Sequence, residues 1–293
     1  MKRMLSIAAA AVMAAALFTG CGGTGAGKKV EYVVLEESLS DEQYAIGFRK
    51  EDQTLRDEVQ RLLCEMKKDG KLAEITKKWF GTDTSTVPDS FTPSDASDDS
   101  LQKIKDKKEF VLGLDDSFPP MGYQDTKGNI IGYDIDLATE VCSRMGVTLK
   151  LQPIDWDSKE LELSQGSIDC IWNGMSINDE RQEKMNLSEP YMKNRQVVVT
   201  LKRNKIEKIE DLKDKMVSLQ KGSTAVDALN GRADVKALIQ GGEATEVTDN
   251  VLAMYELRQG TSDAVIMDEV VARYYIAHLS ELDAKSSETS EAE

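Results

Sequence analysis

Histidine and cysteine are scarce in this chain. Only one of its 293 residues is a histidine, His278, and four are cysteines. A single histidine excludes the common histidine-based catalytic schemes. Apart from Cys21 in an opening apolar stretch, the cysteines are Cys64, Cys142 and Cys170, an odd number that gives no disulfide framework. We expect these three to be buried free thiols.

Basic residues and long apolar runs are also few. The 37 lysines and arginines are outnumbered by 52 acids, and the formal net charge is −15. Such a surface argues against nucleic acid and anionic lipid as partners. Two segments, Gly20–Gly25 and Gly22–Lys28, fit glycine-rich phosphate-loop patterns, but neither follows a predicted strand. We therefore predict no cofactor and no metal ion.

The opening stretch MKRMLSIAAAAVMAAALFTGC has two basic residues, an alanine-rich apolar run and a cysteine. This run is too short for a good membrane-spanning helix, and no other stretch is long enough. It resembles the signal of bacterial lipoproteins. That resemblance implies that residues 1–21 are a signal peptide with its lipidation site, and that palmitate or similar acyl chains on Cys21 anchor the protein to the extracytoplasmic face of the cell membrane. Residues 22–29 read as a tether.

The first organised region precedes a polar segment. We expect strands at Tyr32–Leu35 and Tyr44–Phe48, then an amphipathic helix at Thr54–Lys68 with Asp52 as a possible N-cap. A shorter helix follows, with Trp79 packed in the core. Residues 82–100 are dominated by Ser, Thr, Asp and Pro, which is typical of a linker.

Strands and helices alternate after the linker. This alternation favours an α/β fold with parallel strands. The expected strands are Phe110–Leu114, Thr148–Gln152, Ile168–Trp172, Gln196–Leu201, Met216–Leu219, Thr245–Val247 and Ala264–Met267, and the helices between the early ones are Ile135–Met145 and Ser158–Gln165.

Arg181 follows the apolar run Ile168–Trp172 after a short polar turn. Asn173 and Gly174 tolerate such a turn. Ser176 or Asn178 can then cap a helix that begins near residue 179. Arg181 would stand at the lip of a cleft, where a guanidinium group suits a carboxylate bidentately. The alternative is an arginine on a solvated helix face, paired with a neighbouring acid.

Four segments together resemble a known family, the polar amino-acid binding proteins of ABC importers, or bacterial extracellular solute-binding proteins of family 3. They are Leu114–Val141, Ile168–Tyr191, Gln220–Leu229 and Asp263–Tyr275. A fifth, Glu42–Gly81, looks like the segment that normally closes these proteins, yet here it comes first. The resemblance implies an α/β, two-lobe, type II periplasmic-binding-protein-like fold in circularly permuted order, with hinge strands near Gln43–Phe48 and Gln196–Leu201.

The domain boundaries that follow are expectations. They are the signal and lipidation cysteine (1–21), the tether (22–29), lobe 2 strands with the second hinge strand (30–48), closing-type helices that pack on lobe 1 (49–82), the linker (83–107), lobe 1 (108–195), the first hinge strand with lobe 2 (196–280) and an acidic tail (281–293).

The resemblance also implies roles for individual residues in holding an amino acid's head group. Arg181 would pair with the ligand α-carboxylate, helped by Thr224 at a helix amino terminus. Asp268 would hold the α-ammonium, although it could also be a helix cap. The Gly174 carbonyl and the Ser176 hydroxyl would complete this set, with Asn173 beside them.

Three further residues are implied in contacts with the ligand side chain. Phe118 and Trp156 would be aromatic walls, or else ordinary core residues. Asp115 would meet a polar or cationic group, or else be a turn residue.

The function implied is extracytoplasmic binding of a free polar amino acid, and its delivery to an ABC importer permease by cleft closure. We expect a monomer that is not an enzyme. Two alternatives remain from this sequence. One is a sensory ligand-binding module, and the other is an enzyme like cyclohexadienyl dehydratase on the same fold.

Overall fold

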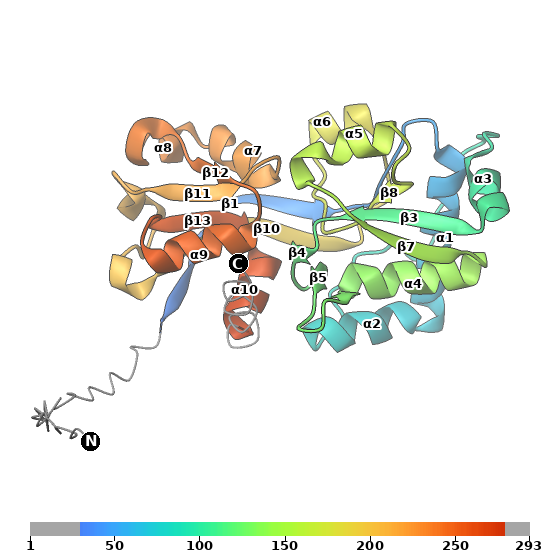
Figure 1. Cartoon of the computed structure of the whole chain (residues 1–293), viewed down its shortest axis with the longest axis horizontal. Helices are drawn as coiled ribbons and strands as arrows, with labels where there is room; N and C mark the ends of the chain where they lie inside the picture. Colours follow the sequence, from blue (N-terminus) through green and yellow to red (C-terminus); the bar gives the residue numbers. More distant parts are fainter. Residues whose placement is uncertain (1–29, 279–293) are drawn as a thin grey trace, which may run out of the picture. The chain divides into compact units, whose positions relative to one another are not determined.

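Two five-stranded sheets organise the part of the chain that the computed structural model describes, residues 30–278. The described residues from Glu31 onward form one unit. We call the part around the sheet β7-β3-β8-β2-β9 lobe 1 and the part around the sheet β1-β10-β13-β11-β12 lobe 2 (Figure 1). The predicted signal peptide, Cys21, the tether and the acidic tail lie outside the described residues.

Lobe 1 has a mixed sheet. Strands β3 and β7, and β3 and β8, are parallel, whereas β2 runs antiparallel to β8 and β9. Its strands are β2 (Gly47–Phe48), β3 (Glu109–Leu114), β7 (Thr148–Pro153), β8 (Cys170–Ile171) and β9 (Asn186–Leu187). Its helices are α1 (Gln53–Asp69), α2 (Lys71–Phe80), α3 (Ser100–Lys107), α4 (Tyr133–Met145), the 3-10 helix η1 (Trp156–Ser158), α5 (Lys159–Ser164) and α6 (Asp179–Lys184). A small sheet comprises β4 (Ser117–Phe118), β5 (Gly122–Gln124) and β6 (Ile130–Ile131).

Lobe 2 has helices on both faces of its sheet, with α7 and α8 on one and α9 on the other (Figure 1). Its strands are β1 (Tyr32–Tyr44), β10 (Met192–Leu201), β11 (Val217–Gln220), β12 (Thr245–Val247) and β13 (Ala264–Asp268). Its helices are α7 (Thr224–Gly231), α8 (Ala233–Lys236), α9 (Asn250–Gln259) and α10 (Glu269–Ala277), with 3-10 turns at Lys202–Asn204, Ile209–Leu212 and Gln240–Gly242. Because both faces are covered, β13 is buried along its whole length, which explains its continuous apolar sequence Ala-Val-Ile-Met.

The chain crosses between the lobes twice, and the two crossings lie side by side. Tyr44 pairs with Met192 in the lobe 2 sheet, and Gly47 pairs with Leu187 in the lobe 1 sheet. Residues 45–46 and 188–191 are therefore the hinges. The expectation of a hinge at Gln196–Leu201 is wrong, because those residues lie inside β10 and pair with β1 on one side and β13 on the other.

Strand β1 also differs from the sequence expectation. The strand predicted at Tyr32–Leu35 continues as β1 to Tyr44, for 13 residues, with register shifts between Val34 and Ser40. The strand predicted at Tyr44–Phe48 is divided between the end of β1 and β2. The charged and polar residues in its middle do not alternate cleanly with apolar ones. The strand is held by its antiparallel pairing with β10, which the local pattern does not reveal.

Helix α1 begins at the predicted place but is capped differently. Asp52 occupies the N-cap position without a side-chain cap bond, and it forms an ion pair with Arg49 instead, 2.7 Å away. The Asp98 carboxylate accepts the Thr54 N–H at 2.9 Å, and the Ser100 hydroxyl accepts the Leu55 N–H at 3.1 Å. Residues from another segment thus satisfy the free amides that every helix start presents.

The expected linker at 83–107 is therefore only partly a linker. Its last eight residues form helix α3, which begins at Ser100. Val87 is buried, and the Thr86 N–H donates to the Tyr191 carbonyl at 2.9 Å. The segment is fastened near both of its ends, to the hinge residue Tyr191 and to the start of α1.

Two side-chain expectations have different outcomes. Cys64, Cys142 and Cys170 are free and buried, as predicted. Trp79 is only half-buried, and its Nε1 donates to Asp136 at 2.7 Å, so its description as a core residue is wrong. Between residues 30 and 278, none of the helices has the length and apolar character needed to cross a membrane.

Replacement of Asp98 by alanine tests whether the linker caps α1. Hydrogen bonds from Ser100 and Thr54 outweigh burial and lower the pKa of Asp98 to about 2. We expect Asp98→Ala to reduce the free energy of unfolding at pH 7 by about 1–3 kcal/mol in urea titrations. Because the pKa is depressed in the folded state, this difference should shrink as the pH falls from about 4 to 2.

Asp95→Ala is the matched control, since Asp95 is an exposed acid of the same segment. An equal loss of stability in both variants, or none in Asp98→Ala, would contradict capping by the linker.

Candidate functional site

A small cavity lies between the lobes. Its lining comes from both lobes and consists of Phe118, Trp156, Asn173, Gly174, Ser176, Arg181, Gln220, Ser223, Thr224 and Asp268. The cavity has a volume of about 10 Å³, which is about enough for one water molecule. Every residue predicted to bind ligand lines it except Asp115.

Arg181 is one of the charged groups at this cavity. Asn178 caps helix α6, since its side-chain oxygen accepts the Arg181 N–H at 2.8 Å, and this places Arg181 in the first turn. Arg181 is 4% exposed, and its guanidinium donates to the Ser176 carbonyl at 2.7 Å and to the Gly222 carbonyl at 3.2 Å. Burial lowers its pKa from the usual value. The alternative of a solvated arginine is wrong, and Glu180 pairs with Lys184 instead.

Gly174 permits the close approach of the turn to the opposite wall. Its φ is +57°, and a Cβ there would lie 2.8 Å from Phe118 Cε1. Its N–H donates to the buried Asp134 carboxylate at 2.7 Å. The neighbouring Asn173 accepts the Asp115 N–H at 3.2 Å, while its Nδ2 is buried without a partner among the described residues. Hydrogen bonds between backbone N–H groups and side-chain oxygens therefore fix this turn.

Asp268 is the second charged group that lines the cavity. It stands at the N-cap position of α10 but makes no cap bond, so the alternative reading as a mere helix cap is wrong. Its Oδ1 accepts from the Tyr44 hydroxyl at 2.8 Å and from Asn194 Nδ2 at 2.5 Å. Burial and the charge of Glu42 raise the pKa of Asp268 to about 7, against the opposing effect of the Tyr44 hydrogen bond.

Thr224 and Ser223 line the cavity from the start of helix α7. Ser223 is the N-cap, and its hydroxyl accepts the Ala225 N–H at 3.3 Å. Thr224 is the first helical residue, as predicted, and is 5% exposed. Amides in the first turn of a helix have no intrahelical acceptor and favour an anion.

Two aromatic side chains form walls of the cavity. Phe118 comes from β4 and Trp156 from the 3-10 turn before α5, and they are 5% and 6% exposed. Lys159 Nζ lies 5.0 Å from the Trp156 ring centroid and donates to the Gly222 carbonyl at 3.0 Å. Burial, followed by the charge of Arg181, lowers the pKa of Lys159 to about 8.

Asp115 does not line the cavity, contrary to the prediction. One oxygen accepts from the Ser117 N–H at 2.9 Å and from its hydroxyl at 2.6 Å, as in a turn. The other oxygen accepts from Gln220 Nε2 at 2.7 Å, across the two lobes. Burial raises its pKa. Asp115 is therefore better described as a turn residue, which is the alternative that the sequence left open.

Sequence reasoning missed several polar residues around Asp268. Glu42 of β1 accepts a hydrogen bond from the Ser176 hydroxyl at 2.6 Å and from the Thr224 hydroxyl at 3.1 Å. Asn194 and Gln196 of β10 also donate to it. The sequence offered one signal for these residues. Polar residues occur together within strands that otherwise bury apolar residues.

Direct contacts join the rims of the cleft. Lys221 Nζ of lobe 2 lies 2.8 Å from Asp157 of lobe 1, and Asn178 donates to Asp227 at 2.8 Å. On the other side, the hydroxyls of Tyr123 and Tyr274 are 2.8 Å apart. This structure is therefore a closed form. No cluster of metal-binding side chains occurs between residues 30 and 278.

The comparisons with known proteins agree with this geometry. The family model of bacterial extracellular solute-binding proteins, family 3, matches residues 6–82 and 110–267. The L-cystine-binding protein TcyJ of Escherichia coli (strain K12) is 28% identical over 179 residues, which are 60% of this chain and 65% of that protein. The arginine-binding extracellular protein ArtP of Bacillus subtilis (strain 168) is 26% identical over 64% of this chain and 73% of its own length.

A solved structure is similar in both sequence and fold. It is the substrate-binding protein of an ABC uptake transporter from Streptococcus pneumoniae with bound histidine. The identity is 38%, the TM-score is 0.62, and the match covers 64% of this chain and 77% of that one. The two-lobe α/β fold is thus shared with a binding protein.

Replacement of Gly174 by alanine tests the close approach at the turn. A non-glycine residue at positive φ costs about 1–2 kcal/mol, and crowding against Phe118 should raise the total loss to about 2–4 kcal/mol. Gly166→Ala is the control, because Gly166 has a φ of +79° but nothing within 4 Å of its Cβ position. Denaturant titration should show the larger loss for Gly174→Ala, and equal losses would contradict a steric role.

Proposed function

Since this chain belongs to the bacterial extracellular solute-binding proteins of family 3, we propose that it binds a polar amino acid outside the cytoplasm and delivers it to an ABC importer. The observation that carries this proposal is the placement of Arg181 and Asp268 on opposite lobes around one cavity. Any α-amino acid carries a carboxylate and an ammonium group. A guanidinium and a carboxylate held in one site complement that pair.

The rest of the cavity suits the same head group. The Arg181 fork and the first-turn amides at Thr224 would receive the α-carboxylate. Asp268, the Gly174 carbonyl and the Ser176 hydroxyl would receive the α-ammonium. Phe118 and Trp156 would lie against the ligand side chain, as apolar walls do in small-molecule sites.

Cleft closure follows from the position of these groups. An amino acid is larger than this cavity of about 10 Å³, so the lobes or the cleft side chains must move to admit it. Only the closed form engages groups from both lobes, and the ligand therefore shifts the population toward that form. The permease partner would read this closed form.

The relatives named above are binding proteins for transport, which disfavours the enzyme reading. Their printed ligands are cystine, arginine and histidine. A free polar amino acid is accordingly the ligand class that we propose for this chain, with the protein acting as a monomer.

Two features of the chain's organisation belong to the proposal. The family's usual closing segment, Glu42–Gly81, precedes the rest, which supports a circular permutation through the segment at 83–107. The family model matches in two blocks on either side of that segment. Family members act outside the cytoplasm, and the lipoprotein-like opening supports a lipid anchor on Cys21.

A thermal-shift screen against the twenty amino acids tests the proposed ligand class. At about 100 times its dissociation constant, a bound amino acid should stabilise the protein by about 2.7 kcal/mol. One or a few polar amino acids should raise the melting temperature of the purified chain. A cooperative melting transition that no amino acid shifts would contradict the proposal.

Arg181→Ala should weaken binding of that amino acid by about 2–5 kcal/mol in calorimetry, because the ligand carboxylate loses a desolvated charge partner. Arg61→Ala is the control, since Arg61 is an exposed arginine of α1 that pairs with Glu58 and Glu65. Equal affinity in the wild type and Arg181→Ala would refute the role of Arg181.

The affinity should also depend on pH. Asp268 has a pKa of about 7 without ligand, and it must be ionised to pair with an ammonium group. The dissociation constant should therefore rise by up to about tenfold for each pH unit below 7, and level off above about pH 8. Calorimetry between pH 5.5 and 8.5, roughly the range around that pKa, measures it. A constant affinity over this range would contradict the pairing.

A further inference from the structure

Glu42 lies on the same face of the lobe 2 sheet as the residues around Asp268. Glu42 pairs directly with Asn194 between β1 and β10, and Gln196 pairs directly with Asp268 between β10 and β13. Directly opposed residues share a face of a sheet, and so do residues two apart on one strand. These four side chains therefore form one polar group, which we call the hinge cluster.

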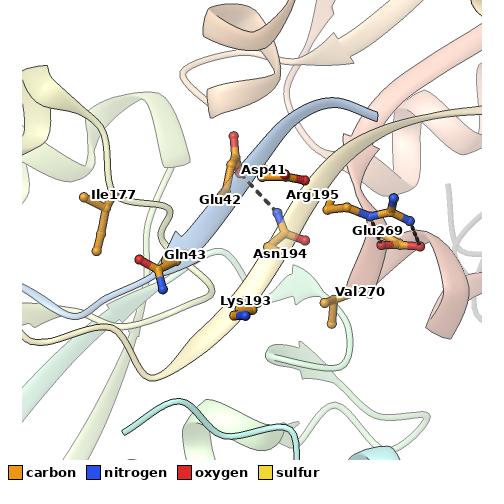
Figure 2. A pocket seen from close by; sticks show the side chains of 9 residues that line it. All are labelled: Asp41, Glu42, Gln43, Ile177, Lys193, Asn194, Arg195, Glu269 and Val270. Atoms are coloured by element: carbon orange, nitrogen blue, oxygen red, sulfur yellow. Dashed lines mark hydrogen bonds and ion pairs between the residues drawn. The ribbon is translucent and has the colours of Figure 1, made fainter. Parts of the chain in front are cut away.

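The Glu42 carboxylate is fixed by donors from both lobes. Besides the hydroxyls of Ser176 and Thr224, Asn194 Nδ2 donates to the same oxygen at 3.1 Å and Gln196 Nε2 donates at 3.0 Å. Figure 2 shows the bond to Asn194, while Arg195 next to it pairs with Glu269. Such contacts hold the carboxylate at the edge of the amino-acid cavity.

The negative charge of the hinge cluster has no compensating ion pair. Within residues 30–278, neither Glu42 nor Asp268 lies within ion-pairing distance of a lysine or arginine. The buried Asp169, by contrast, has Lys107 at 3.1 Å and Arg49 at 3.6 Å. The charge of Arg181 acts on both carboxylates without reaching ion-pair distance, so it offsets their mutual repulsion only in part, and a cation placed between them would relieve the rest.

Acceptor atoms in the hinge cluster also lack donors. Asn194 and Gln196 are 4% and 0% exposed, and each gives its amide N–H to a carboxylate. Their carbonyl oxygens, Asn194 Oδ1 and Gln196 Oε1, are buried without a partner among the described residues. An ammonium group brings three donors and a positive charge, which matches a site with surplus acceptors.

We propose that Glu42 is a specificity-determining residue, a second carboxylate that receives the ligand's ammonium group together with Asp268. This inference rests on the proposed function, because it assigns one more contact in the same site. Glu42 also lines an outer cavity of about 700 Å³ beside strands β1 and β10, with Asp41, Lys193 and Arg195 (Figure 2). The ammonium end of the ligand would thus lie toward the hinge.

The same contacts allow a second interpretation, which gives the opposite prediction. Because Glu42 accepts from the hydroxyls of Ser176 and Thr224, it could stand in for the ligand's own carboxylate and compete with it. The negative charge and the unpaired acceptors Asn194 Oδ1 and Gln196 Oε1 favour the ammonium reading, because they belong to the hinge cluster itself. The unpaired donor at the cavity, Asn173 Nδ2, makes no hydrogen bond to Glu42.

Calorimetry on Glu42→Gln separates the two readings. Glutamine keeps the shape and an acceptor oxygen but removes the charge. The probes are two amino acids with their des-amino analogues, L-histidine with imidazolepropionate and L-arginine with guanidinopentanoate. We expect Glu42→Gln to bind the tighter amino acid about tenfold or more weakly, and to bind its des-amino analogue with little change. Asp41→Asn is the control, because Asp41 is an exposed acid one residue away.

A pH profile provides a readout that a merely structural role would not move. The charge of Glu42 helps to raise the pKa of Asp268, so in Glu42→Gln the pH at which affinity declines should shift downward. Melting curves verify that the variant folds, and Glu42→Asp, which retains the charge, should keep part of the preference for the amino acid.

The outcomes distinguish this inference from the proposed function. If the wild-type protein and Glu42→Gln bind the amino acid with equal affinity, the role of Glu42 is overturned and the proposed function stays intact. If Glu42→Gln binds the amino acid more tightly than the wild type does, the ammonium-binding role of Glu42 is overturned, and Glu42 competes with the ligand carboxylate instead. A folded wild-type protein that binds none of the twenty amino acids contradicts the proposed function, and the role of Glu42 falls with it.

Discussion

The pairing of β1 with β10 is the constraint on which the site depends. These strands are far apart in the sequence, yet Tyr44 lies opposite Met192 where both pass toward lobe 1. Because the two hinge segments are hydrogen-bonded to each other, the lobes can move only about one narrow connection. The same pairing places Glu42 and Asn194 at the base of the cleft.

Buried charge defines what this cleft can hold. Arg181 and Asp268 are both 4% exposed, and burial lowers the pKa of the first and raises that of the second. Each shift reflects the cost of an incompletely compensated charge away from water. A zwitterion supplies opposite charges at both places, which makes an α-amino acid a better occupant than a neutral solute or a simple anion.

Helix capping from the segment at 83–107 ties remote parts of the chain together. The start of α1 depends on Asp98 and Ser100, which lie some 45 residues further along the chain, as the separations of 44 and 45 positions show. A segment whose composition suggests a free coil is thereby held against lobe 1. Such a segment fits the circular permutation that we propose, since chain ends that lie close together can be joined.

The sequence alone determined the α/β class and most strand and helix positions, because apolar runs and caps are local patterns. The proposed head-group residues came from the resemblance to the family, and the structure brings them around one cavity. The sequence placed the hinge before β10 too late, ended β1 too early and did not show that Asp115 lies outside the cavity lining. Only the tertiary structure decided these points, and it alone brought Glu42 beside Asp268. Strand pairing and burial join residues that are remote along the chain, and no local pattern records that proximity.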